Sequence, residues 1–340
     1  SHPIDFWIDF KGTIAENSTP RCAIVRVRYH NYTCEHDIYV RQGYAPITID
    51  GNAESDKNPA WASYNVYCFD ADNAPVYTKL PLEEGSLFRR GNRTAILASN
   101  NDRPGFTFGL GPSGSFDVLE LGATTPSQKT WSQLAPSADD VKSRFASWSI
   151  AGDHERIATI EDFYTLESTS IHSNIGKAYG VLYGDGATET QKSVEVALGY
   201  DHNEDPTNSK KGMRGCFVFN INNSHNIFFP IGKSGYGRRK GMTSNGEKVG
   251  ALRYAQRTDY YNNDGTGNIQ YVPLFYDLFE RPGAIYQCRN RLSSTGSDVK
   301  KSSAFDINYF TMGFEGFENG ASNNSDGSDS DACFIRTVKY

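Results

Sequence analysis

The sequence predicts an α+β fold, in which antiparallel sheets are kept apart from two helices and are joined by long loops. Twenty Tyr and twenty Phe against three Met, with 32 Gly and 14 Pro, are typical of strands separated by turns. Alternating apolar and polar residues occur near both ends of the chain, whereas two helix-like segments fall near its middle. Strand runs on either side of grouped helices favour the α+β class.

Residues 1–49 alternate with period two and predict strands that have one buried face. In "CAIVRVRY", Ala23, Val25 and Val27 point one way, and Arg26 and Arg28 point the other way. Fewer than fifty residues make a weak independent sandwich. We therefore interpret 1–49 as the edge or remnant of an immunoglobulin-like domain, followed by a ligand-binding domain over 50–340. The absence of an initial Met favours a leader or domain removed upstream.

Short strands continue through residues 50–130, broken by Gly, Asn, Asp and Pro. The segment 137–149 then predicts a helix, with Ser137 as N-cap and a stripe of apolar residues at helical spacing. A second helix is predicted from Thr159, where Asp162 three residues later completes a capping-box pattern.

Strands return in the C-terminal half, in "GCFVFNI", "NIFFPIG", "VGALRYA", "AIYQC", "AFDINYFTMGF" and "CFIRTVKY". A run of Asn, Ser, Asp and Gly over 321–331 comes directly before the last of these strands. Disorder usually concentrates at chain ends. This polar run instead lies between two strands, which predicts a loop held at both ends.

Charge and composition exclude several classes of function. The net charge is −6 and the basic residues gather only in "GYGRRKG", so the sequence predicts no nucleic-acid partner. No apolar run is long enough to span a bilayer, and no signal peptide is visible. The six cysteines include no C-x-x-C pair and are too sparse for a disulfide scaffold, which leaves one or two bridges or buried thiols open.

Local motifs favour turns over chemistry. "GLGPSG" at 109–114 matches a dinucleotide fingerprint, but a strand-like segment follows it, so we interpret it as a glycine-rich hairpin. Cys34 lies between His30 and His36 in a predicted turn, where ordinary side chains are favoured over a nucleophile and base. The oxygen-rich segments 200–209 and 323–331 lack EF-hand spacing, so no cofactor is predicted, with calcium as the one alternative.

A set of longer strings gives a family resemblance over residues 50–340. The strings are "RIATIEDFYTL" (156–166), "YGVLYGDG" (179–186), "GMRGCFVFN" (212–220), "NIFFPIGKSGYGRRKG" (226–241), "LRYA" (252–255), "LFYDLFERPGAIY" (274–286), "AFDINYFTM" (304–312) and "SDACFIRTVK" (330–339). Together they resemble the C-type-lectin-like domains of Bacteroidetes surface and fimbrial proteins, which are related to the Fibrobacter succinogenes major paralogous domain. The resemblance implies a C-type-lectin-like fold preceded by immunoglobulin-like strands.

The resemblance also implies a function. It predicts an exported, non-catalytic adhesin at the cell surface, outer membrane or pilus tip, with a host or bacterial surface protein or a glycan as ligand. Loops rich in Asn, Ser, Asp, Gly and Tyr resemble the variable regions of diversity-generating retroelements. Such loops can change without touching a rigid core. The expected ligand-binding residues are Tyr260, Tyr261, Asn262, Asn263, Tyr286, Gln287, Arg289, Asn290, Arg291, Glu315, Phe317, Asn319, Asn323, Asn324 and Asp326.

Two alternatives stay open. "YQCRNR" is similar to the cysteine-bearing strand of formylglycine-generating enzymes, which would make Cys288 a nucleophile with a second thiol nearby. A structural pilus subunit would instead assemble with its partner subunits through the N-terminal strands. The structural alternative predicts an unpaired strand edge near residues 4–28.

Overall fold

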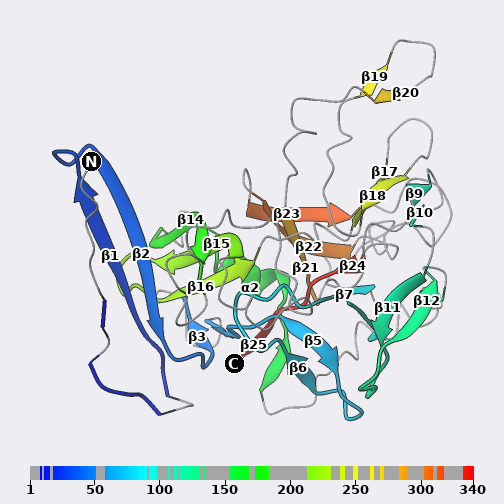
Figure 1. Ribbon diagram of the computed structural model, residues 1–340, viewed down its shortest axis with the longest axis horizontal. Helices are drawn as coiled ribbons and strands as arrows, with labels where there is room; N and C mark the ends of the chain where they lie inside the picture. The colour runs from blue at the N-terminus through cyan, green and yellow to red at the C-terminus, as the bar shows by residue number, and fades with distance from the viewer. Residues whose placement is uncertain are drawn as a thin grey trace.

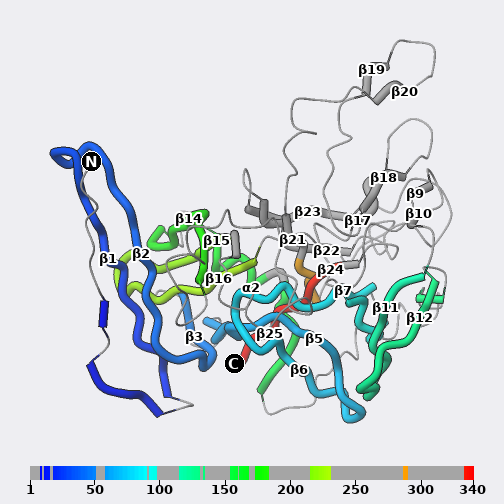
Figure 2. Tube along the Cα trace, viewed as in Figure 1, coloured from blue at the N-terminus to red at the C-terminus, as the bar shows by residue number. Residues whose placement is uncertain are grey.

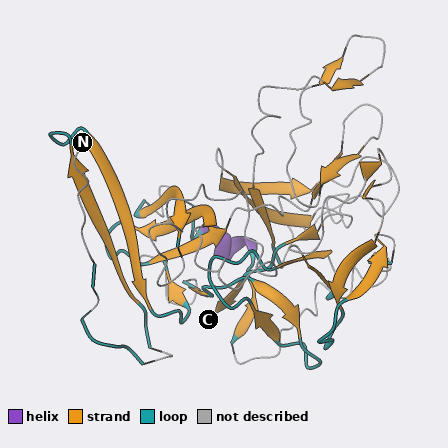
Figure 3. Cartoon of the chain, viewed as in Figure 1, coloured by secondary structure: helices purple, strands orange, loops and turns teal. Residues whose placement is uncertain are grey.

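The computed structural model shows a mostly β protein (Figures 1 and 3). About half of the residues that the structure describes lie in strands, and about 3% of them lie in helix. The residues that the structure describes are 8–9, 11–15, 18–50, 58–89, 92–97, 106–107, 111–112, 115–130, 133–134, 154–167, 173–183, 213–230, 238–241, 248–251, 261–263, 269–271, 283–289, 302–308, 312–317 and 332–340.

The strands are short, and several of them fall in segments that the sequence predicts, whereas β19 lies in a segment expected to be a loop. They are β1 (Arg21–Tyr29), β2 (Cys34–Gln42), β3 (Ile47–Thr48), β4 (Ala60–Trp61), β5 (Val66–Phe69), β6 (Pro75–Tyr77), β7 (Ser86–Arg89), β8 (Ala95–Leu97), β9 (Phe106–Thr107), β10 (Gly111–Pro112), β11 (Ser115–Leu119), β12 (Ser127–Thr130), β13 (Glu155–Ile157), β14 (Ile175–Leu182), β15 (Met213–Asn220), β16 (Asn226–Pro230), β17 (Arg238–Gly241), β18 (Lys248–Ala251), β19 (Tyr261–Asn263), β20 (Ile269–Tyr271), β21 (Gly283–Gln287), β22 (Ser302–Asn308), β23 (Met312–Phe317), β24 (Ala332–Cys333) and β25 (Thr337–Lys339).

The expected α+β class, a C-type-lectin-like fold with two helices, is wrong. The described part of the chain contains one helix, α2 (Ile160–Tyr164), of five residues, and the remaining elements are strands. The helix predicted over 137–149 lies outside the described residues. Sheets dominate because most apolar segments are short and rich in aromatic and β-branched residues, which suits strands better than helices.

The predicted capping box at the start of α2 is confirmed. The Thr159 hydroxyl accepts a hydrogen bond from the Asp162 backbone N–H, and the Asp162 carboxylate accepts one from the Thr159 backbone N–H. These two bonds satisfy donors that the first turn of a helix leaves unpaired. Arg156 also donates to the Asp162 carboxylate, which fixes α2 against β13.

β1 and β2 form an antiparallel two-stranded sheet that projects from one side of the molecule (Figures 1 and 2). A turn between the two strands is confirmed at residues 30–33, where His30, Asn31 and Tyr32 have positive φ, but Cys34 itself is the first residue of β2. The alternation predicts opposite faces for Ala23 and Arg26 but does not say which face meets the core. The core is contacted by Cys22 and by its cross-strand neighbours on the Arg26 face, whereas Ala23 on the opposite face is exposed.

A small four-stranded sheet, which we call the closing sheet, joins β3 and β4 to β13 and to the C-terminal strand β25. Its order is β13-β25-β4-β3, so segments near both ends of the chain meet in it. Val338 pairs with Trp61, and Ile47 pairs with Trp61 from the other side. β3 lies before the expected domain boundary at residue 49, yet it pairs with β4 beyond that boundary.

The described strands form three further sheets of three or more strands. They are the five-stranded sheet β12-β11-β8-β7-β24, the three-stranded sheet β14-β15-β16 and the three-stranded sheet β21-β22-β23. The described strands also form two-stranded sheets, namely β1-β2, β5-β6, β9-β10, β17-β18 and β19-β20. β9 and β10 pair antiparallel, and β11 follows them as a strand; of the segment 109–114, Gly111 and Pro112 are described and lie in β10, and the rest of the expected glycine-rich hairpin lies outside the described residues.

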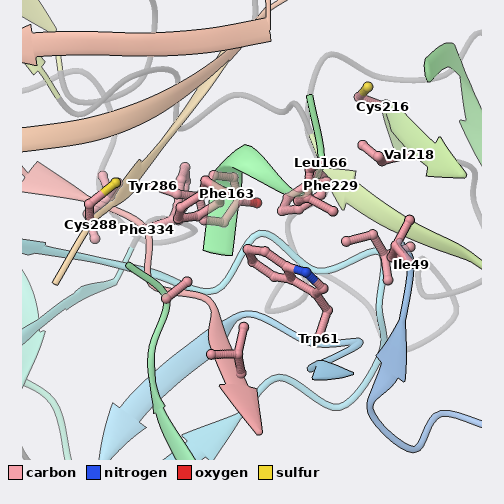
Figure 4. Packing of buried hydrophobic residues seen from close by; sticks show 14 of the residues in the cluster. Ile49, Trp61, Phe163, Leu166, Cys216, Val218, Phe229, Tyr286, Cys288 and Phe334 are labelled. Atoms are coloured by element: carbon pink, nitrogen blue, oxygen red, sulfur yellow. The ribbon is translucent and has the colours of Figure 1, made fainter. Parts of the chain in front are cut away.

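The main core lies between the closing sheet, α2 and β16 (Figure 4). Trp61 is fully buried, and its ring centroid lies 5.0 Å from that of Phe163 and 6.3 Å from that of Phe229. Tyr286 and Phe334 extend the cluster from β21 and from the residue after β24. Fully burying one such aromatic or aliphatic side chain contributes about 1.5–3 kcal/mol.

Arg336 is buried within this aromatic core. Its guanidinium donates to the carbonyl oxygens of Ala62 and Phe228, at 2.9 and 3.0 Å, and lies 4.7 Å from the ring centroid of Phe229. Burial lowers the pKa of Arg336, although an arginine stays protonated in proteins. Because the residues from Cys333 to Val338 are all buried, the polar run before them is anchored on its C-terminal side, as predicted.

Candidate binding site

Two adjoining cavities lie at the root of the β1–β2 hairpin, where β2 turns into the body. We call the first, of about 510 Å³, the apolar cleft, because it opens onto Leu82, Phe217 and Phe228, and the second, of about 560 Å³, the polar cleft, after Glu155 and Lys339 in its lining; most of the exposed lining of both is apolar. Both volumes fall in the range of small-molecule sites. Gln42, Gly43, Tyr44 and Ser63 line both cavities, so these residues form the wall between them.

The apolar cleft opens onto a small hydrophobic cluster. Leu82, Phe217 and Phe228 are buried there, and Tyr39 packs against them from β2. The Tyr39 and Phe217 rings are stacked, with centroids 4.8 Å apart and planes 11° apart. Burial, followed by the nearby charge of Asp37, raises the pKa of Tyr39 to about 12. This stack holds the hairpin against the β14-β15-β16 sheet.

Arg41 holds the residues of the shared wall in place through hydrogen bonds. Its guanidinium donates to the carbonyl oxygens of Gly43, Ala45 and Asn226, and to the hydroxyl of Ser63, over 2.6–2.9 Å. Burial lowers the pKa of Arg41, and the charge of Arg336 acts in the same direction. Most of the N–H donors of its guanidinium are thereby used within the protein. We conclude that Arg41 positions the wall and is not a ligand-binding group.

The polar cleft takes its lining from several separate segments. Tyr44 and Tyr64 form a tilted aromatic pair, with ring centroids 5.6 Å apart and planes 56° apart. The side chain of Tyr44 is 46% exposed, and that of Tyr64 is half-buried. Burial, followed by the proximity of Tyr44, raises the pKa of Tyr64 to about 12. The Tyr64 hydroxyl is therefore neutral at physiological pH and can both donate and accept.

Glu155 and Lys339 supply the charged groups in the lining of the polar cleft. They are direct cross-strand partners on β13 and β25. The Oε1 atom of Glu155 accepts hydrogen bonds from the hydroxyls of Tyr77 and Thr337, the latter at 2.7 Å. Among the described residues, its Oε2 atom accepts no hydrogen bond and Lys339 forms no ion pair. One carboxylate oxygen and one ammonium group thus remain available for a ligand.

Residues 13–15 form the outer wall of the polar cleft. The Gln42 amide nitrogen donates to the Gly12 carbonyl oxygen at 2.9 Å, and Arg21 donates to the Lys11 carbonyl oxygen at 3.2 Å. Ile14 packs over Gly43, so a Cβ added there would meet the flexible end of the Ile14 side chain. The stronger reason for glycine is its φ of +90°, which other residues rarely adopt.

The structure places the sequence-predicted site residues in three groups. Tyr286 and Gln287 are buried in the core, with 0% and 3% exposure, so they are not exposed anchors. The Tyr286 hydroxyl accepts a hydrogen bond from the Asn65 amide at 3.1 Å, and burial raises the pKa of Tyr286. Arg289 is half-buried, and its backbone N–H donates to the Ala158 carbonyl oxygen.

The second group lies in strands. Tyr261, Asn262 and Asn263 form β19, paired with β20. Glu315 and Phe317 lie in β23. Ala304 of β22 pairs with Glu315 on one side and with Gln287 of β21 on the other. The third group lies outside the described residues and comprises Tyr260, Asn290, Arg291, Asn319, Asn323, Asn324 and Asp326. The two oxygen-rich segments considered for calcium also lie outside the described residues.

Cys288, the nucleophile of the enzyme alternative, is fully buried in the main core (Figure 4). All six cysteines are present as thiols. Burial raises the pKa of Cys22, Cys68 and Cys216, the last to about 12, which makes these thiols poor nucleophiles. The enzyme alternative gains no support from the position of Cys288.

The residues of the two clefts were missed by the sequence interpretation. One local signal was present, because Gly43 interrupts an alternating run and is followed by Tyr44 and Pro46. A glycine at that position indicates a turn. The pairing of Glu155 with Lys339 depends on two strands far apart in sequence, which no local pattern indicates.

Comparison of the chain with protein-family models, curated proteins and solved structures gave no match. Among the described residues, no helix is both long and apolar enough to cross a bilayer.

Proposed function

We propose that this protein is a non-catalytic binding protein that is exported and acts as an adhesin at the cell surface, outer membrane or pilus tip. The observation that carries this proposal is the polar cleft, where the exposed Tyr44 and the half-buried Tyr64 share a lining with Glu155 and Lys339. Tyrosine-rich surfaces give large contact areas at low entropic cost, and they are typical of recognition sites. The expected ligand is a host or bacterial surface protein or a glycan.

The loops of the C-terminal half belong to the same proposal. β23 pairs with β22 on one side of the polar run, and β24 pairs with β7 on the other side. A loop whose two ends are fixed in sheets can vary in sequence at little cost to the core. We propose that residues 319–326 take part in recognition as a variable display loop.

A binding screen with the purified chain tests this function. A glycan array and a panel of surface proteins would be probed with the wild-type chain, with Tyr44→Ala, and with a variant carrying Gly-Ser in place of residues 319–330. Binding that is lost in either variant, with an unchanged circular dichroism spectrum, supports the proposal. The absence of any glycan or protein ligand for the folded wild-type chain contradicts it.

A second candidate, a structural pilus subunit, is favoured by one observation. Within the described residues β1 pairs only with β2, so the outer edge of its nine residues is unpaired. An unpaired strand edge can accept a strand from another chain. In analytical ultracentrifugation this function predicts oligomers that grow with concentration and that are lost in Ala23→Lys, which places a charge on the edge strand. A strict monomer at all concentrations would contradict it.

A further inference from the structure

We infer that the polar cleft binds a neutral carbohydrate. This inference deepens the proposed function and rests on it, because it names the ligand class of one site. The first argument is the aromatic corner that Tyr44 and Tyr64 form at 56° to each other. Sugar rings present polarised C–H groups that stack on aromatic faces, and an exposed ring such as Tyr44 offers such a face.

The hydrogen-bonding groups of the cleft suit a polyhydroxylated ligand. Glu155 Oε2 can accept, Lys339 Nζ can donate, and the neutral Tyr64 hydroxyl can do both. Tyr64 makes no hydrogen bond with the described part of the chain through its hydroxyl. Vicinal hydroxyls combine donors and acceptors in one small group, so a saccharide suits a lining that offers an acceptor, a donor and a group that is both.

The charge balance of the lining favours a neutral ligand. Glu155 and Lys339 are the two charged residues among those that line the polar cleft, and they have opposite signs. A strongly anionic or cationic ligand would meet one like charge at close range. A neutral saccharide meets both as hydrogen-bonding groups.

The backbone of the cleft disfavours an extended peptide. Most of the lining comes from three segments outside strands, which are residues 13–15, 43–46 and 62–64. Peptides that bind by strand addition require a row of unpaired backbone groups along an edge. Pro46 has no N–H, and the Ser63 hydroxyl is already bonded to Arg41 and to the Tyr44 carbonyl oxygen.

Saturation-transfer NMR followed by isothermal titration calorimetry tests the inference. The probes are maltotriose, cellotriose, mannotriose and N-acetyllactosamine, with sialyllactose as the anionic comparison. Tyr44→Ala removes the exposed ring, Tyr64→Phe removes only a hydroxyl, and Lys339→Met removes the ammonium. Tyr32→Ala is the matched control, since Tyr32 is 78% exposed at the hairpin turn, outside the cleft lining.

We expect at least one neutral saccharide to bind the wild-type chain and Tyr32→Ala equally, and sialyllactose to bind more weakly. Loss of the Tyr44 ring should weaken binding about tenfold, which corresponds to about 1.4 kcal/mol. Tyr64→Phe and Lys339→Met should each weaken it about threefold to tenfold, as expected for single hydrogen bonds.

Two results would overturn the inference. One is that no saccharide binds, and the other is that saccharides bind equally well to Tyr44→Ala and Tyr64→Phe. If a protein ligand from the screen binds while no saccharide does, the proposed function stands and only the carbohydrate assignment fails. If neither class binds, both fail.

Discussion

Arg41 on the hairpin donates a hydrogen bond of 2.6 Å to the hydroxyl of Ser63 in the body of the protein. The same guanidinium also holds three carbonyl oxygens. Arg41→Met would leave these acceptors without a partner in a largely buried site. We expect the free energy of unfolding, measured with urea, to fall by about 3 kcal/mol.

Arg28→Met is the matched control for this experiment. Arg28 pairs with Glu35 at 2.7 Å on the exposed part of the hairpin. Exposed ion pairs contribute at most about 1 kcal/mol. Similar losses of stability for the two variants would contradict the role assigned to Arg41. Hydrogen exchange over residues 21–42 should accelerate only in Arg41→Met.

Gly43→Ala tests the contact that seats the outer wall of the polar cleft. Its φ of +90° is unfavourable for alanine, and the added Cβ would displace Ile14. Gly12→Ala separates these two effects, because Gly12 has a φ of +84° but open space where the added methyl group would stand. Each variant should lose about 1 kcal/mol from backbone strain.

The two glycine variants should differ in local mobility. Only Gly43→Ala should speed hydrogen exchange and proteolysis of residues 11–15, because the Cβ added at Gly43 displaces the Ile14 side chain, whereas the Cβ added at Gly12 meets open space. Equal rates in the two variants would show that Ile14 does not hold this segment.

Thr159→Ala removes one half of the capping box of α2. The Asp162 backbone N–H would lose its acceptor at the start of the helix. Loss of an N-cap typically costs about 1 kcal/mol of stability. Thermal and urea unfolding should show this decrease, whereas Thr159→Ser, which retains the hydroxyl, should stay near wild type. A fully stable Thr159→Ala would mean that tertiary packing alone holds the helix.

Alkaline pH should destabilise the fold. Burial raises the pKa of Cys216 from 9.0, and those of Tyr39 and Tyr64 from 10.0, to about 12 in each case. The unfolded chain therefore releases these protons at lower pH than the folded chain does. Their stabilising contribution is complete below about pH 9 and is lost as the pH rises towards 12.

Urea unfolding at pH 8, 9, 10 and 11 measures this loss. Tyr64→Phe and Cys216→Ala should each make the decline with pH shallower, because each removes one titrating group. A decline that is unchanged in both variants would assign it to other residues.

Local signals in the sequence predicted local structure well. Thr159 and Asp162 lie three residues apart, so their capping box is contained in one short window and is confirmed. The strand segments are also found, because alternation is a property of consecutive residues. Alternation does not say which face meets the core, and the hairpin packs through the face of Cys22.

Long-range pairing explains what the sequence did not indicate. Tyr286 lies in the predicted strand "AIYQC" just before a polar segment and is expected to be a ligand anchor, but a β-bridge pairs it with Phe334 and its side chain is buried in the core. The polar cleft likewise requires β13 and β25 to meet before Glu155 and Lys339 become neighbours. Tertiary contacts of this kind override local composition.

The position of β25 between β13 and β4 has a consequence for how the protein is made. β25 is synthesised long after β3 and β4, so β4 leaves the ribosome paired on one side with β3 and without β25 on the other. Loop closure over such sequence separation slows folding and prolongs the exposure of apolar surface. We expect the nascent chain to depend on chaperones until Val338 can reach Trp61.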